Sequence, residues 1–494
     1  MKTMAKSTNA LQWMKTAFGL LGLGLLIFVL AAITSLSAEL SARLIPIFIL
    51  PIILSIGLLS RNSVPLTDKF KGRWLVLLVI ILILWPTYFM AKIGGLPTID
   101  PRKFMAGGGI AVLIFILISR SDLAKTWKEY PTKTKLLAWT IGILTLLRIA
   151  AAITSTQAPM ASLIMVMWEV VYYYSMFYVA LFIFNTPRQQ ELFRVTLISL
   201  GIIEGFYAAF ERVSTINFFM KIAPRIPENA DFFAGEAISR WRDGAFRAQG
   251  TFAHPLLLSE FGAFLACLSA SMIFFSKRAL SRYIGLLGLF SGCLCVYVSG
   301  SRTGFLATGA GVGIIGIAWI CSLQREAASR RLMFVLLASA AIVVSIPAVT
   351  LLSSGKTVSE RHSSAARQIM VQRGLPSIVQ HPVLGTGPGT APSIAGILGG
   401  NNVLTLDSYL LAIGIDSGVP VLILFVFAYL GTAWISINNA LSHPDLNHTT
   451  IYGCSAALIS LFIFRIILAT PDNMSLAFLT IGILATTFPK KAAT

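Results

Sequence analysis

The sequence predicts an all-α integral membrane protein, a bundle of roughly 12–14 transmembrane helices in one domain over residues 1–494. Of the 494 residues, 56% are hydrophobic and only 12% are charged, and the mean hydropathy is +0.79. A typical soluble domain carries about 25% charged residues. The apolar residues also gather in runs of about 20, the length that a helix needs to cross a bilayer.

Apolar windows along the chain predict roughly fourteen spans. In chain order they are 17–37, 44–60, 74–93, 105–119, 136–155, 161–185, 194–214, 253–275, 283–299, 304–322, 332–353, 407–436, 450–468 and 473–488. The first is as long as a full span and longer than the core of a cleaved signal peptide, so we expect it to stay in the protein. The window at 407–436 is long enough to begin outside the bilayer or to be broken.

The net charge of +19 would suggest a nucleic-acid partner in a soluble protein. Here the basic residues are scattered through short connections between apolar windows, a pattern that reports membrane topology, so we expect no nucleic acid. The connections rich in Lys and Arg are the N-terminus, 61–73, 120–135, 276–282 and 323–331. Counting spans places them on one side, the cytoplasm, and both termini with them.

The same count puts three polar elements together on the outer side. They are the two long segments 215–252 and 354–405, expected to be periplasmic loops, and the turn SGSRTG from Ser299 to Gly304. All five cysteines lie in or beside apolar windows, so the sequence indicates no disulfide framework and no metal site. It also has no nucleotide-binding glycine signature, and we expect no cofactor.

Two arginines stand at the start of predicted spans on this outer side. Arg247 and His254 lie within the motif RAQGTFAHP, and Arg302 lies in SGSRTG. Each arginine is either an anchor at the membrane boundary or part of a site. For Arg302 the neighbouring glycines and serines would let an anionic ligand approach backbone N–H groups closely. His254 either caps and packs at the helix start or contributes to a site.

The second long segment carries more basic residues and a turn. Residues 359–374 have helical apolar spacing and predict a short interfacial helix that carries Arg361 and Arg367. Arginines on such a helix either face water and lipid headgroups or reach a site. The sequence HPVLGTGPG, from His381 to Gly389, predicts a tight turn.

Asp407 stands at the start of the long window 407–436. A carboxylate at a membrane edge is unfavourable unless it is solvated, paired or functional, and capping the helix is the alternative role. Ionisable residues inside predicted spans are candidates for functional sites or for packing pairs. These residues, whose pairing the sequence leaves open, are Arg148, Glu169, Glu204, Glu260 and Arg465.

The order of these motifs resembles the O-antigen ligase and polymerase family of bacterial envelopes, most strongly over 240–435. The resemblance implies a polytopic glycosyltransferase of the GT-C type in the bacterial inner membrane. Such an enzyme transfers glycan from an undecaprenyl pyrophosphate carrier to a hydroxyl on the periplasmic side. Membrane lipids surround it, and its expected partners are the flippase and the chain-length regulator of a polysaccharide assembly system.

The resemblance also implies roles for individual residues. The family's essential arginines match Arg247 and Arg302, and its catalytic histidine is replaced by Asp407 in DSYLLAIGIDSGVPV, where Gly418 is kept and Val421 departs from the pattern. Asp407 would accept a proton from the attacking hydroxyl, in an inverting transfer without a metal. The remaining expected substrate-binding residues are Arg361, Arg367, His254, His381, Gly385 and Gly387.

The predicted function is therefore a polysaccharide polymerase, which joins exopolysaccharide or O-antigen repeat units. One alternative is an O-antigen ligase that transfers finished glycan to lipid A core or to a protein. The other is a polysaccharide or lipid transporter or flippase, which many spans with internal charges would equally suit.

Overall fold

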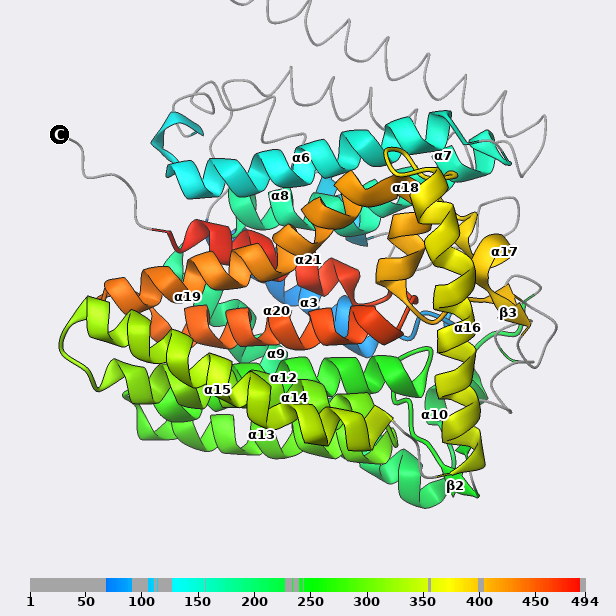
Figure 1. Cartoon of the computed structure of the whole chain (residues 1–494). Coiled ribbons are helices and arrows are strands. Elements are labelled where there is room, and N and C mark those ends of the chain that lie inside the picture. Colours follow the sequence, from blue (N-terminus) through cyan, green and yellow to red (C-terminus); the bar gives the residue numbers. More distant parts are fainter. Residues whose placement is uncertain are drawn as a thin grey trace, which may run out of the picture.

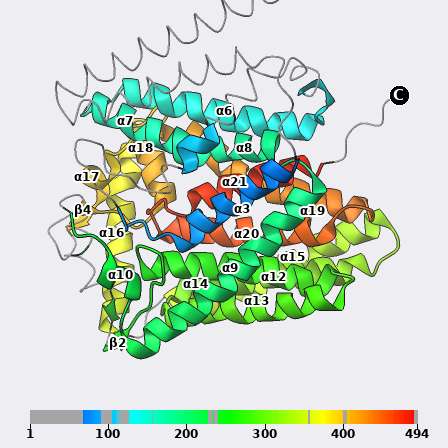
Figure 2. The same cartoon turned by 180° about the vertical axis from the view of Figure 1, so that it is seen from behind.

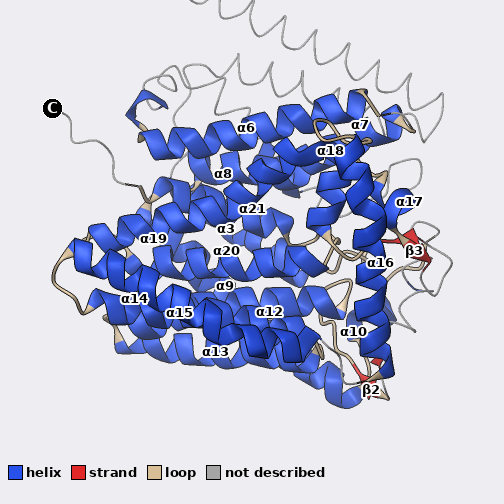
Figure 3. Ribbon diagram, viewed as in Figure 1, coloured by secondary structure: helices blue, strands red, loops and turns tan. Residues whose placement is uncertain are grey.

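The computed structural model describes most of the chain from Asp68 onward. The described residues are 68–90, 105–110, 113, 127–155, 157–226, 233, 240–242, 244–353, 357–398 and 404–488. Helices dominate this part, and its strands are two hairpins of two residues per strand (Figure 3). Nine of the described helices are long and apolar enough to cross a membrane. The protein is thus an all-α polytopic membrane protein, as predicted.

The elements follow one another with short connections. In chain order they are α3 (Asp68–Leu84), α6 (Thr132–Ile153), α7 (Pro159–Glu169), the π-helix η1 (Val170–Tyr174), α8 (Ser175–Ile183), α9 (Pro187–Ser214), α10 (Phe218–Ile222), β1 (Trp241–Arg242), β2 (Ala245–Phe246), α12 (Pro255–Phe275), α13 (Ala279–Val298), α14 (Arg302–Ser322), α15 (Ala327–Ser353), α16 (Val358–Gln380), α17 (Ala391–Ala395), β3 (Ile397–Leu398), β4 (Leu404–Thr405), α18 (Tyr409–Val426), the π-helix η3 (Phe427–Gly431), α19 (Thr432–Ser442), α20 (His448–Ile467) and α21 (Met474–Thr486).

Most predicted spans correspond to these helices with shifts of a few residues. The windows at 17–37 and 44–60, and most of 105–119, lie outside the described residues. The window at 74–93 was misplaced: α3 begins at Asp68, inside the expected basic loop, and ends at Leu84 because Pro86 cannot continue a helix. The window at 473–488 forms α21, whose 13 residues span about 20 Å, less than the ~30 Å apolar core of a bilayer.

The long helices run side by side, and α16 crosses their ends (Figures 1 and 2). We call this the α16 end; there α6, α9 and α13 end and α12, α14 and α18 begin. The described parts of 215–252, Ser299–Gly304 and 354–405 all lie at this end, as the count of spans predicts. The opposite end, where α14 connects to α15, we call the α15 end.

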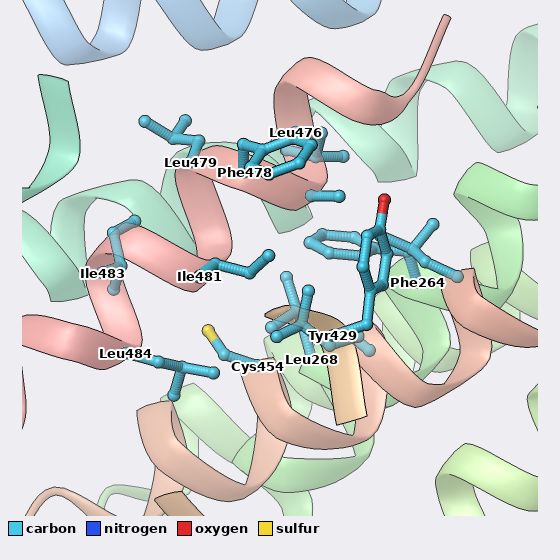
Figure 4. Close-up of a cluster of buried hydrophobic side chains, with 14 of the residues drawn as sticks. Phe264, Leu268, Tyr429, Cys454, Leu476, Phe478, Leu479, Ile481, Ile483 and Leu484 are labelled. Carbon is cyan, nitrogen blue, oxygen red and sulfur yellow. The ribbon is translucent and has the colours of Figure 1, made fainter. Parts of the chain in front are cut away.

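The centre of the bundle is built from α12, α20 and α21. Their buried side chains interlock around Phe264, Cys454 and Phe478 (Figure 4). Helices α12 and α13 approach closely because glycines face each other: a Cβ on Gly262 would lie 2.7 Å from the carbonyl oxygen of Gly292. Small residues at helix contacts are typical of membrane bundles.

The predicted short helix at 359–374 is longer than expected. Helix α16 continues through Gly374 and Pro376 to Gln380. Its extension packs on α18, where a Cβ on Gly374 would lie 2.8 Å from the Cδ1 of Ile415. Met370, Leu411 and Ile415 form a small apolar cluster there that the sequence pattern alone did not reveal.

Candidate functional site

Carboxylates of α9 hold the segment from Arg247 to His254. Glu211 accepts a hydrogen bond of 2.7 Å from the backbone N–H of Gly250. Glu204, about two helical turns earlier on α9, accepts a hydrogen bond of 2.8 Å from the backbone N–H of Thr251. Gly250 has φ +62, and a Cβ there would lie 1.9 Å from Glu204 Oε1, so only glycine fits.

A second set of buried groups completes this support. The Asn217 side-chain amide donates a 2.7 Å hydrogen bond to the carbonyl of Gly250. Arg240 donates to Glu211 at 2.6 Å, and its own carbonyl accepts a 2.7 Å bond from the N–H of Arg247. The backbone that carries Arg247 is therefore fixed by charge-assisted hydrogen bonds, which are stronger than neutral ones.

Arg247 is buried at the turn before α14. Only 7% of the residue is exposed, and its Nε donates a 2.7 Å hydrogen bond to the carbonyl of Ser299. Its Nη2 is enclosed and has no hydrogen-bond partner. The neighbouring Ala248 donates its N–H to the carbonyl of Val298 at 3.0 Å. Two of the predicted polar elements thus pack directly against each other.

The turn itself places Arg302 beside this contact. Gly300 adopts φ +63, where a Cβ would meet the side chain of Arg247 at 3.5 Å. Ser301 caps α14 by accepting a 3.2 Å hydrogen bond from the N–H of Gly304, and half-buried Arg302 is the first residue of the helix. Arg247 and Arg302 therefore flank one turn at the start of a helix, where backbone N–H groups favour anions.

The electrostatics of this cluster are those of a cationic site. Burial, and then the nearby Arg242, lowers the pKa of Arg247 to about 10. Burial, and then Arg247, lowers the pKa of His254 to about 3. Both shifts mean that positive charge is disfavoured as the site stands, and an anion bound there would relieve this.

His254 has the capping role that the sequence left open. Its Nδ1 accepts a 3.1 Å hydrogen bond from the N–H of Leu256, and it is the N-cap of α12. A ring nitrogen that accepts this bond is unprotonated, so the proton of the neutral ring is assigned to Nε2. That N–H is available to a ligand oxygen.

Asp407 belongs to a second cluster at the same end. Its Oδ2 lies 3.4 Å from Nε of Arg367 on α16, and the side chains are 37% and 33% exposed. The capping alternative for Asp407 is wrong, because Ser408 caps α18 by accepting from the N–H of Leu411 at 3.3 Å. A solvated ion pair contributes little to stability, so Asp407 can exchange this partner for a substrate group.

The predicted turn from His381 to Gly389 docks on a break in α18. The break is at Gly418, whose φ of 79 and ψ of 179 are not helical. Next to it, the N–H of Val419 donates a 2.8 Å hydrogen bond to the carbonyl of Pro382. A Cβ on Gly418 would lie 2.6 Å from that carbonyl oxygen. The glycine of the DSYLLAIGIDSG motif is therefore required by loop docking.

Close packing also explains the two glycines predicted to bind substrate. Gly385 has φ +64 and lies so close to α18 that a Cβ would be 2.4 Å from the carbonyl oxygen of Ile415. Gly387 has φ +115, and a Cβ added there would lie 2.0 Å from the Oγ of Ser155. His381 is exposed beyond the end of α16. Substrate binding by these three residues stays a prediction.

Asp416 is the residue that the sequence analysis missed. Its carboxylate accepts hydrogen bonds from the N–H of Gly389 at 3.0 Å and of Ala391 at 2.9 Å. Arg148 lies 4.0 Å from this carboxylate and pairs with Glu169, with its Nε 2.9 Å from Glu169 Oε2. The signal was present, because Asp416 is a carboxylate within an apolar window.

Arg465 and Glu260, two of the ionisable residues inside predicted spans, are also paired. Arg465 donates to Glu260 across the bundle, and Asn473 donates to the same carboxylate at 2.9 Å. Arg465 also donates to the carbonyl of Thr470 at 2.7 Å. These contacts fix the connection between α20 and α21, so the pair has a packing role.

The structure thus forms two clusters at the α16 end. Arg247, Arg302 and His254 gather at the starts of α12 and α14, while Asp407 and Arg367 lie between α16 and α18. Helix α16, with exposed Arg361 near its start, runs along the end of the bundle from one region to the other (Figure 1). In the described residues, no group of His, Cys, Asp and Glu is arranged to hold a metal ion.

Comparison with known families gives a match over part of the chain. Residues 287–426 match the family described as O-antigen ligase. The matched region extends from within α13 to the end of α18 and contains Arg302, Arg361, Arg367 and Asp407, whereas Arg247 and His254 precede it. The comparison with curated proteins gave no match.

Proposed function

The chain is a protein of the O-antigen ligase/polymerase family, and we propose that it is a polysaccharide polymerase of the GT-C type. It takes glycan from an undecaprenyl pyrophosphate carrier and joins it to a hydroxyl of a second lipid-linked repeat unit. No metal takes part in this proposal.

The observation that carries the proposal is a buried arginine at the α16 end without an anionic partner. The described residues include five buried arginines: Arg148, Arg194, Arg247, Arg330 and Arg465. Three face carboxylates, in the pairs Arg148 with Glu169, Arg194 with Glu191, and Arg465 with Glu260. Arg247 has none, and a buried cation without an anion is strongly unfavourable. A bound pyrophosphate supplies the missing charge.

Arginine suits this ligand for a geometric reason. Its planar guanidinium presents parallel N–H groups that match two phosphate oxygens, and it stays charged. Arg247 and Arg302 would hold the pyrophosphate from two sides of the Gly300 turn, and Arg361 or Arg367 would add a third cation. Neutral His254 would donate from Nε2 to a phosphate oxygen without adding charge.

The transfer is proposed as one displacement. The acceptor hydroxyl oxygen attacks the anomeric carbon, the bond from that carbon to the pyrophosphate oxygen breaks, and the configuration inverts. The hydroxyl proton passes to Asp407. The leaving lipid pyrophosphate keeps the bonding electron pair, and Arg247 and Arg302 stabilise its developing charge. Arg367 holds Asp407 until the acceptor arrives.

The charge distribution supports a periplasmic site. The short connections at the α15 end carry Lys277, Arg278, Arg325 and Arg331, and basic residues in short connections are typical of the cytoplasmic side. The α16 end then faces the periplasm of a bacterial inner membrane, where lipid-linked repeats are delivered by a flippase. A chain-length regulator of the same assembly system is the second expected partner, and both termini are expected in the cytoplasm.

The test is polysaccharide length in a deletion strain that expresses variants of the full chain. Arg247→Lys, Arg302→Lys and Asp407→Asn should each abolish long chains and let single lipid-linked repeats accumulate. Arg225→Lys is the matched control, because Arg225 is exposed at the same end. Normal chains from all three site variants would refute the assignment.

The same strain separates the two alternatives. A ligase would leave long lipid-linked polymer when it is lost, whereas a polymerase leaves single repeats. A transporter would leave its lipid-linked substrate on the cytoplasmic side, where an added periplasmic glycosidase cannot reach it.

A further inference from the structure

A second buried arginine lacks an anion, at the end of the bundle far from the candidate site. Arg330 lies in the first turn of α15 and is 9% exposed. Its Nε is enclosed without a hydrogen-bond partner, and within the described residues no carboxylate forms an ion pair with it. The α15 end, where it lies, is opposite α16 (Figure 1).

The surroundings of Arg330 and Arg331 come from α20 and from the end of α19. Arg330 lies near buried Tyr452 of α20, whose ring packs 4.8 Å from that of Phe275 and 5.4 Å from that of His448. The next residue, Arg331, donates a 3.0 Å hydrogen bond from Nε to the hydroxyl of Ser442. Arg331 therefore contacts the end of α19, and Arg330 faces α20.

The local acidic residues leave Arg330 uncompensated. Glu326 is exposed and accepts a 3.4 Å hydrogen bond from the hydroxyl of Ser329. Asp445 is exposed in the connection between α19 and α20. Burial of a guanidinium without a counter-charge is strongly unfavourable. The site is therefore complete only with an anion.

The position of the site identifies the source of that anion. Directly after the two arginines, α15 exposes Leu332 at 62% and Leu336 at 61%, apolar side chains that a lipid tail would cover. A free phosphate ion would use the arginines but would leave this apolar face unused. Basic pockets between helices at a membrane surface are suited to lipid headgroups.

We propose that Arg330 and Arg331 bind the phosphate of an anionic phospholipid whose acyl chains lie along α15. This site is separate from the glycan-transfer site, and its occupation does not depend on the proposed enzymatic activity. The lipid would tie α15 to the connection between α19 and α20, and so stabilise the α15 end of the bundle.

The test compares the purified full-length protein in bilayers of phosphatidylcholine and in bilayers that also contain phosphatidylglycerol. We expect phosphatidylglycerol to raise the unfolding temperature of the wild type, and Arg330→Gln to abolish this rise. Arg325→Gln, which removes an exposed charge at the same end, should keep the rise. A rise that survives Arg330→Gln, or no rise in the wild type, would overturn the proposal.

Two further arms decide the remaining outcomes. Inorganic phosphate added to phosphatidylcholine bilayers should give no rise; an equal rise would assign the site to a free ion and overturn the lipid. If Arg330→Gln cannot be purified, mass spectrometry of lipids retained by the wild type still decides. Preferential retention of phosphatidylglycerol supports the site, and retention in proportion to the membrane composition contradicts it.

Discussion

Substitution of Gly418 by alanine tests how the loop from His381 to Gly389 is held. Gly418 interrupts α18 with φ 79 and ψ 179. A Cβ added there would lie 2.6 Å from the carbonyl oxygen of Pro382 and 2.7 Å from that of Val383. Both contacts are with backbone, so no flexible side chain can move aside.

The expected magnitude follows from two effects. A non-glycine residue in this backbone region costs about 1–3 kcal/mol, and overpacking a tight contact costs a further 1–3 kcal/mol or so. The sum is about 2–6 kcal/mol, and roughly 1.4 kcal/mol corresponds to a tenfold change in population. The docked loop would thus become less populated by about one to four orders of magnitude.

The assay is limited proteolysis of the purified protein, followed over the bonds between His381 and Gly389, with polysaccharide length measured in cells. Gly418→Ala should expose the loop to cleavage and shorten or abolish the polymer. Gly313→Ala is the matched control, because Gly313 is helical and its added Cβ would meet nothing within 4 Å. Equal cleavage and equal polymer length for the two variants would refute the reasoning.

Three further predictions concern the charged groups. Glu211→Ala removes the partner of Arg240 and of the Gly250 N–H, and it should destabilise the protein by about 3–5 kcal/mol in chemical unfolding; a loss below about 1 kcal/mol would contradict the buried pairing. Arg367→Gln removes the solvated ion pair with Asp407 and should change the free energy of unfolding by at most about 1 kcal/mol. It should nevertheless reduce polymer formation. Chemical unfolding measures the first quantity, and gel electrophoresis of the glycan measures the second. The pKa of His254 in the folded protein is about 3, below its value of about 6.5 in the unfolded chain. The contribution of neutral His254 to the free energy of unfolding is therefore fully present above pH 6.5 and is lost as the pH falls toward 3. His254→Asn, which keeps a capping side chain, should flatten the dependence of the unfolding temperature on pH across that range. An unchanged slope would argue against a neutral His254 ring in the folded state.

The membrane fold could be predicted from the sequence because apolar length and the placement of basic residues dominate it. Windows such as 136–155 and 253–275 are set by the thickness of the bilayer, and α6 and α12 follow them closely. The error at α3 came from Pro86, since the apolar window continues past a residue at which the helix must stop.

The candidate site was predictable only in part, because the pairing of side chains depends on how helices pack. The motifs pointed to Arg247 and Arg302, and the structure places both around the Gly300 turn. The sequence did not reveal that Asp416 receives the N–H groups of the loop, or that Glu211 supports Arg247 through Gly250. Those partners are far apart along the chain, and no local spacing connects them.

The central claim is that Arg247 and Arg302 bind a lipid pyrophosphate, and the most direct measurement is the affinity of the purified full chain for a short polyprenyl pyrophosphate. We predict that Arg247→Lys and Arg302→Lys each weaken binding by roughly 10–100-fold, because a hydrogen bond to a charged group contributes about 1.5–3 kcal/mol. Arg330→Gln, at the opposite end, should leave the affinity unchanged. Equal affinities for the wild type and both lysine variants would contradict the account.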